Sequence, residues 1–118
     1  MKKTEKAELL KGKPLNLAKA VDYRSGSVVS KALLDKKAGS LTLFAFDHGQ
    51  GLSEHTSPYD AVVQMLDGQA EITIGGKPIL AAAGDLVIMP AGIPHALKAV
   101  TRFKMLLTMI WDKGAQAG

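Results

Sequence analysis

Short apolar runs alternate with turn signals along most of the chain. Glycine and proline recur at roughly the eight-to-twelve-residue spacing of a β-sandwich or barrel of short strands. Helical periodicity is weak throughout. We therefore expect an all-β domain, with strands near residues 15–23, 27–34, 41–47, 60–66, 70–74, 77–82, 86–89, 94–99 and 103–111.

Two of these segments show the alternation of a strand with one face buried. In the first, Ala70, Ile72 and Ile74 point one way, and Gly75-Gly76 then forms a two-residue hairpin turn into residues 77–82. Glycine suits such a turn because it adopts positive φ angles without a Cβ clash. In the last segment one face is apolar from Phe103 to Trp111, and the other face is half apolar. We expect both faces of that last strand to be covered.

Composition narrows the class of protein without naming a function. The 118 residues suit one domain, which we divide into a basic leader (1–13), a β-barrel (14–112) and a C-terminal tail (113–118). The leader holds five lysines against two glutamates, so +3 of the net +4 charge lies there. The barrel therefore lacks the basic surface of a nucleic-acid-binding domain.

The chain contains no cysteine, no long apolar run and no visible secretory signal. A protein without thiols or disulfides suits a reducing compartment, and a membrane helix needs about 20 apolar residues. We expect a cytoplasmic protein that binds neither nucleic acid nor membrane.

The segment from Gly84 to His95 carries the most specific spacing in the chain. Gly84, Pro90, Gly92 and His95 form the pattern G-x5-P-x-G-x2-H. This pattern resembles the second motif of the cupin superfamily in every fixed position up to the histidine. The cupin motif usually closes with asparagine four residues after the histidine, where this chain has Ala99.

The first cupin motif, G-x5-H-x-H-x3–4-E-x6-G, is matched in part. Gly49, His55 and Gly68 stand at their positions, whereas Ser57 replaces the second histidine and Ala61 the glutamate. The chain is thus similar to a small single-domain, RmlC-like cupin. The resemblance implies a double-stranded antiparallel jelly-roll barrel with a pocket between its sheets.

The alternation of side chains along residues 94–99 predicts which way His95 points. Lys98 should face water, so Ala96 also faces out while His95 and Leu97 face in. An inward imidazole must find a partner, because burying its ring nitrogens unpaired is costly. His48 sits beside a glycine turn and is expected at the surface.

In metal-containing cupins, three histidines and one carboxylate hold a divalent metal, and this chain keeps only His55 and His95. Asp60 could supply a carboxylate only if a bulge or loop turned it inward. Three interpretations of the two histidines stay open: a structural pair, groups that contact a ligand, or a pair holding Fe, Mn, Zn or Ni weakly. A tight catalytic metal site normally has three protein ligands, so the cofactor is a weakly held metal or none.

The preferred function is a metal-poor binding or sensor domain. It would hold a small organic molecule in the barrel, lined by His55, Ser57, Ala61 and His95. If they face inward, Met65, Met89, Met105 and Met109 would add an adaptable apolar lining. The alternative is a metal-dependent dioxygenase or isomerase using His55, His95 and a nonstandard third ligand.

We also expect a homodimer. The segments 15–23 and 27–34 are apolar on parts of both faces, and an exposed apolar sheet surface favours association. The cupin resemblance points the same way.

Overall fold

The computed structural model describes residues 10–111, so most of the predicted leader and all of the predicted tail lie outside the described residues. Within this range one short 3₁₀ helix precedes nine strands. The elements are η1 (Leu17–Lys19), β1 (Val28–Lys36), β2 (Gly39–Phe46), β3 (Gly51–His55), β4 (Asp60–Asp67), β5 (Gln69–Ile74), β6 (Lys77–Ala82), β7 (Leu86–Met89), β8 (His95–Ala99) and β9 (Phe103–Ile110).

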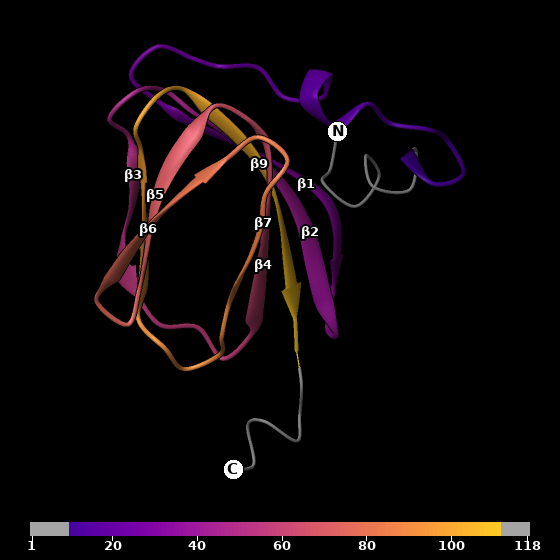
Figure 1. Cartoon of the computed structure of the whole chain (residues 1–118). Helices are drawn as coiled ribbons and strands as arrows, with labels where there is room; N and C mark the ends of the chain where they lie inside the picture. Colours follow the sequence, from indigo (N-terminus) through magenta and orange to yellow (C-terminus); the bar gives the residue numbers. More distant parts are fainter. Residues whose placement is uncertain (1–9, 112–118) are drawn as a thin grey trace.

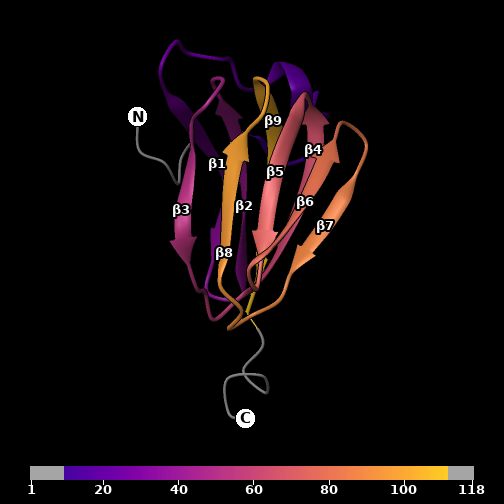
Figure 2. The same ribbon diagram turned by 60° about the vertical axis from the view of Figure 1, so that its left-hand side comes forward.

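The strands form two antiparallel sheets that face each other (Figure 1). Sheet A has the order β1-β2-β9-β4-β7 and sheet B the order β3-β8-β5-β6. Figure 2 shows the four strands of sheet B side by side. The jelly-roll barrel predicted from the sequence is confirmed.

The core lies between the two sheets and receives side chains from both inner faces. Phe46 of β2 and Phe103 of β9 are opposite each other in register, and their rings stack with centroids 4.3 Å apart. Ile72 and Leu97 of sheet B belong to the same buried cluster. The four methionines whose direction the sequence left open face inward: Met65, Met89 and Met105 are buried in this cluster, and Met109 packs against it.

The sequence correctly predicts the β5–β6 hairpin but misses β3. Gly75 and Gly76 both have positive φ, and β5 pairs with β6 along the whole length of each strand. Residues 51–55 were not expected to form a strand, because Ser53, Glu54 and His55 give no apolar alternation. Pairing with β8 makes this segment the edge strand of sheet B.

The prediction of a strand at residues 15–23 is wrong, because this segment pairs with no other strand. We call residues 16–23 the N-terminal strap, because they cross the outer face of sheet A. Asn16 caps η1 by accepting from the Lys19 backbone N–H, and Val21 packs with Leu43 in a second buried cluster. The strap's apolar residues cover the sheet instead of pairing with a strand.

Polar contacts fix the strap at several points. Nζ of Lys104 donates to the carbonyl of Ala18 at 2.6 Å, and Nζ of Lys31 donates to that of Ala20 at 3.3 Å. The hydroxyl of Tyr23 donates to Asp67 Oδ2 at 2.5 Å. The pKa of Tyr23 is raised well above its ordinary value, mainly by burial and next by this hydrogen bond. The phenol therefore stays protonated and donates.

The strap covers only part of sheet A's outer face. On β9, Leu106 is buried beneath it, whereas Ile110 is 49% exposed. The expectation that both faces of the last strand are covered is therefore half right. Leu86 and Ile88 of the edge strand β7 are also exposed, and the homodimer stays a prediction.

Among residues 10–111 no helix has the length and apolar character needed to cross a membrane.

Gly68, at the tight β4–β5 turn, provides a test of the packing between turns. Its φ is +73°, and a Cβ there would lie 1.8 Å from the carbonyl oxygen of Arg102. Gly84 also has positive φ, at +95°, but a Cβ there would meet nothing within 4 Å. Gly84→Ala should cost about 1 kcal/mol of unfolding free energy through backbone strain. Gly68→Ala should cost about 1–3 kcal/mol more, because the clash is added. Urea denaturation of both variants measures the difference, and equal losses would contradict the close approach.

Candidate functional site

His95 lies at the start of β8 with its side chain on the inner face of sheet B. It is 3% exposed, Leu97 is also buried, and Lys98 is exposed, as strand parity predicts. Among residues 10–111, His95 and Ser57 are the two buried polar residues. Buried polar groups in an apolar interior need hydrogen-bond partners.

His55 meets His95 because β3 contains a bulge. Leu52 is opposite Leu97 and His55 is opposite His95, so β3 has three steps where β8 has two. A β-bulge inserts one extra residue and re-aims the side chains beyond it. His55 thereby comes to contact His95 from the exposed edge of the sheet.

The two imidazoles are directly hydrogen-bonded. Their Nε2 atoms are 3.2 Å apart, and their rings meet edge to face with centroids 4.5 Å apart. Nδ1 of His55 lies 2.7 Å from the carbonyl of Ser53. A carbonyl only accepts, so Nδ1 of His55 carries the proton, and Nε2 of His55 has a lone pair that can accept. In a neutral pair, Nε2–H of His95 must then donate to Nε2 of His55.

Protonation of His95 is disfavoured. Burial, followed by repulsion from His55, lowers the pKa of His95 below its ordinary value of 6.5, and only the contact with the Ile93 carbonyl opposes this. At neutral pH the buried imidazole is therefore uncharged. It can donate through Nε2, or through Nδ1 to the Ile93 carbonyl 3.3 Å away.

Ser57 and Ala61 are both buried at this end of the barrel. Oγ of Ser57 accepts from the Tyr59 backbone N–H at 3.0 Å. The backbone carbonyl of Ser57 accepts from the Gly92 N–H at 2.8 Å. Ala61, on β4, is 1% exposed and lies opposite Met89 and Met109 in register. Ser57 therefore ties its loop to the turn that precedes His95, and Ala61 lines the inner face of sheet A.

Asp60 does not complete a metal site. Its Oδ1 accepts from the backbone N–H of Ala91 at 2.9 Å, so the carboxylate fixes the turn after β7. Within the described range 10–111, no group of three His, Asp or Glu side chains is placed to hold a metal ion.

The geometry of the two imidazoles alone would nevertheless suit a metal. Bonds of about 2.0–2.1 Å to each Nε2, spanning 3.2 Å, would subtend an angle of about 100°, near the tetrahedral value. If Nδ1–H of His95 donates to Ile93, both Nε2 lone pairs are free, and metal-binding histidines commonly donate to carbonyls in this way. The two imidazoles have suitable geometry for a metal, but they are fewer than the three protein ligands of a typical catalytic site.

His48 is exposed, as expected, and lies at the other end of sheet B. The neighbouring Gly49 N–H bonds the carbonyl of Ala99 at the end of β8, whereas His95 begins that strand. Sequence reasoning missed the bulge and the carbonyl partners Ser53 and Ile93. The bulge leaves no signal in one sequence beyond the unpatterned Ser53-Glu54.

These features define a class: a small two-sheet β-barrel with an imidazole pair reaching its interior. The cupin domain family model matches residues 42–111. The conserved SPY1581 protein of unknown function from Streptococcus pyogenes is 40% identical, with 86% of this chain and 90% of that chain covered and a TM-score of 0.82. No curated protein matches the chain.

Two further solved structures agree. The cupin superfamily protein DSY2733 from Desulfitobacterium hafniense is 32% identical, covering 86% of this chain and 94% of that one, with a TM-score of 0.81. A cupin 2 conserved barrel domain protein from Leptotrichia buccalis is 39% identical, with 81% of this chain and 47% of that chain covered and a TM-score of 0.79. This chain belongs to the cupin family.

Replacing His95 should change both the free energy of unfolding and its dependence on pH. His95→Ala removes the partner of His55 and should cost about 1–3 kcal/mol of unfolding free energy near pH 8. In the wild type the unfolded state binds a proton below about pH 6.5 before the folded state does, so stability falls as the pH drops through that range. His95→Ala should remove this part of the fall, measured by urea denaturation at several pH values.

His48→Ala is the control, because it removes an exposed imidazole. It should change stability by no more than about 0.5 kcal/mol and leave the pH dependence intact. Equal behaviour of the two variants would mean that His95 is not specifically buried.

Proposed function

We propose that this cupin binds a small organic molecule at the histidine end of its barrel, as a metal-poor binding or sensor domain. The observation that carries the proposal is the hydrogen-bonded pair of an exposed and a buried imidazole, with Nε2 atoms 3.2 Å apart. Small-molecule sites are typically apolar surroundings with a few placed polar groups.

The composition of the two barrel ends supports this location. Large rings fill the end near Phe46 and Phe103, which are both fully buried. Near His95 the inner faces carry Ala61, Met89 and Met109 instead. Methionine adapts its shape to neighbouring groups, so a ligand is more readily accommodated at the histidine end than at the aromatic end.

The ligand's polar group would exchange hydrogen bonds with the pair. Nε2–H of His95 can turn from His55 to a ligand acceptor, and the lone pair on Nε2 of His55 can accept from a ligand hydroxyl or amine. Because burial lowers the pKa of His95, this imidazole is a neutral donor at pH 7.

The competing function is a metal-dependent enzyme of the dioxygenase or isomerase kind. His55 and His95 would be two of its ligands, and the favourable Nε2 separation is the observation behind it. It needs a third ligand that residues 10–111 do not supply from His, Asp or Glu. The binding function therefore has the stronger support.

Ligand carry-over during purification tests the binding function directly. Purified protein is denatured, and the released small molecules are measured by mass spectrometry. Wild type should release a compound near one equivalent per chain, and His95→Ala should lose most of it, since one polar contact to a buried site is worth about 1–3 kcal/mol, or roughly five- to a hundredfold in affinity.

His48→Ala, at the opposite end of sheet B, should retain the compound as wild type does. Release of the same compound at the same level from His95→Ala would place its binding elsewhere. Release of nothing from any folded protein would count against a resident ligand.

Completing the broken ligand set tests the metal alternative. Ser57→His with Ala61→Glu would offer three imidazoles and a carboxylate, a set suited to divalent transition metals. The wild type should bind Mn²⁺, Co²⁺ or Zn²⁺ weakly by titration calorimetry. The double variant should bind at least about tenfold more tightly, which is about 1.4 kcal/mol. The gain should shrink below about pH 6, because only neutral imidazole ligates.

Ser57→His with Ala61→Gln is the matched control, since it has nearly the same volume without the carboxylate. It should bind more weakly than the Glu variant. Tight stoichiometric binding by the wild type would identify an additional ligand and favour the enzyme. A folded double variant with no gain would mean that positions 57 and 61 do not face the imidazoles.

A further inference from the structure

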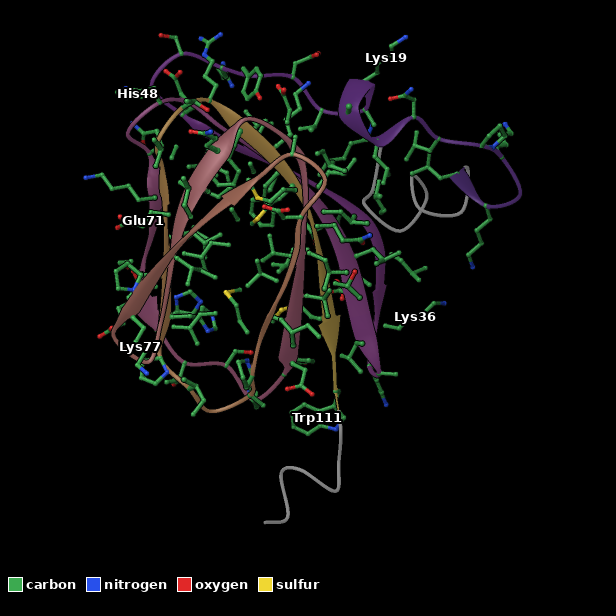
Figure 3. All side chains as sticks on the ribbon, in the orientation of Figure 1. Lys19, Lys36, His48, Glu71, Lys77 and Trp111 are labelled. Carbon is green, nitrogen blue, oxygen red and sulfur yellow. The ribbon has the colours of Figure 1, made fainter. Side chains whose placement is uncertain are left out.

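A concave site lies on the outer face of sheet B, at the end away from the imidazole pair. It is a half-open hollow of about 460 Å³, within the usual size range of small-molecule sites. In Figure 3, His48 and Glu71 mark this side of the sheet. The lining residues are His48, Gly49, Glu71, Lys98, Ala99 and Val100.

Two glycines lie beside Lys98, Gly49 in the lining of the hollow and Gly51 on the neighbouring strand β3. Gly51 is the cross-strand partner of Lys98, and a Cβ on Gly51 would lie 2.2 Å from the carbonyl oxygen of Leu97. Glycine is therefore required there by the close approach of β3 to β8. Gly49, with φ of +80°, makes the turn above it. The stem of Lys98 is left uncovered on the β3 side.

Two opposite charges stand next to each other in the hollow. Glu71 on β5 is the cross-strand partner of Lys98 on β8, and both side chains are exposed. Cross-strand neighbours have Cβ atoms about 4.5–5.5 Å apart. Within residues 10–111 no ion pair joins these two side chains, and neither is engaged elsewhere. Both remain able to meet a ligand.

We propose that this hollow binds a small zwitterion of the α-amino acid class. The ligand's carboxylate pairs with Lys98, its ammonium pairs with Glu71, and an apolar side chain rests on Val100, which is 43% exposed. The spacing of adjacent cross-strand residues matches a molecule that carries both charges close together. Since exposed ion pairs contribute little, the affinity is on the order of millimolar.

The test is an NMR titration of the uniformly ¹⁵N-labelled full chain with L-valine. The amide signals of Gly49, Glu71, Lys98 and Val100 should shift along saturable curves. N-acetyl-L-valine lacks the ammonium and L-valinamide lacks the carboxylate. Each analogue should bind up to about fivefold more weakly, the upper value for losing one exposed ion pair. Linear shifts, or equal binding by all three compounds, would overturn the proposal.

Substitutions on the protein provide the reciprocal test. Lys98→Gln should abolish the preference for L-valine over L-valinamide, and Glu71→Gln should abolish that over N-acetyl-L-valine. Lys77→Gln is the matched control, because Lys77 is also an exposed charge of sheet B but lies toward its other end (Figure 3). A loss of L-valine binding in Lys77→Gln equal to that in Lys98→Gln would show nonspecific charge effects and overturn the assignment. His95→Ala should leave this binding unchanged, which separates the hollow from the barrel site.

Discussion

Face-to-face packing of two sheets is the constraint on which the rest of this structure depends. Every inward position of both sheets must contribute to a single core, and the rings of Phe46 and Phe103 close that core at one end by stacking 4.3 Å apart. At the other end the buried core residues include Ala61 and Met89, and His95 is buried there. An imidazole tolerates that position because His55 partners it. The site is thus a consequence of how the core ends.

The sequence predicts much of this arrangement where one residue's environment depends on its immediate neighbours. The Gly75-Gly76 turn and the inward direction of His95 follow from local rules, positive φ for glycine and parity along β8. The sequence predicts a strand in place of the strap, because Leu17 and Val21 match the apolar positions of a sheet. Their burial against Leu43 depends on a face formed by strands far along the chain.

Ser57 and Asp60 do not complete a metal site and instead have structural roles. The hydroxyl of Ser57 holds the Tyr59 N–H, and Asp60 holds the turn after β7 through Ala91. Both contacts fix the loops that flank the histidine end. The motif spacing alone could not indicate these contacts, because spacing records position and not hydrogen bonding.

The bulge between Leu52 and His55 absorbs the one residue by which β3 exceeds β8 between these two pairs. The residues inside the bulge, Ser53 and Glu54, are exposed, and only the backbone carbonyl of Ser53 contacts an imidazole. Their side chains are free to vary, and loss of one of the two residues would restore regular pairing with the two histidines still opposite each other. Among related chains, a β3 shorter by one residue would therefore be compatible with a preserved imidazole pair, and the position opposite His95 would mark the site better than the residue count does.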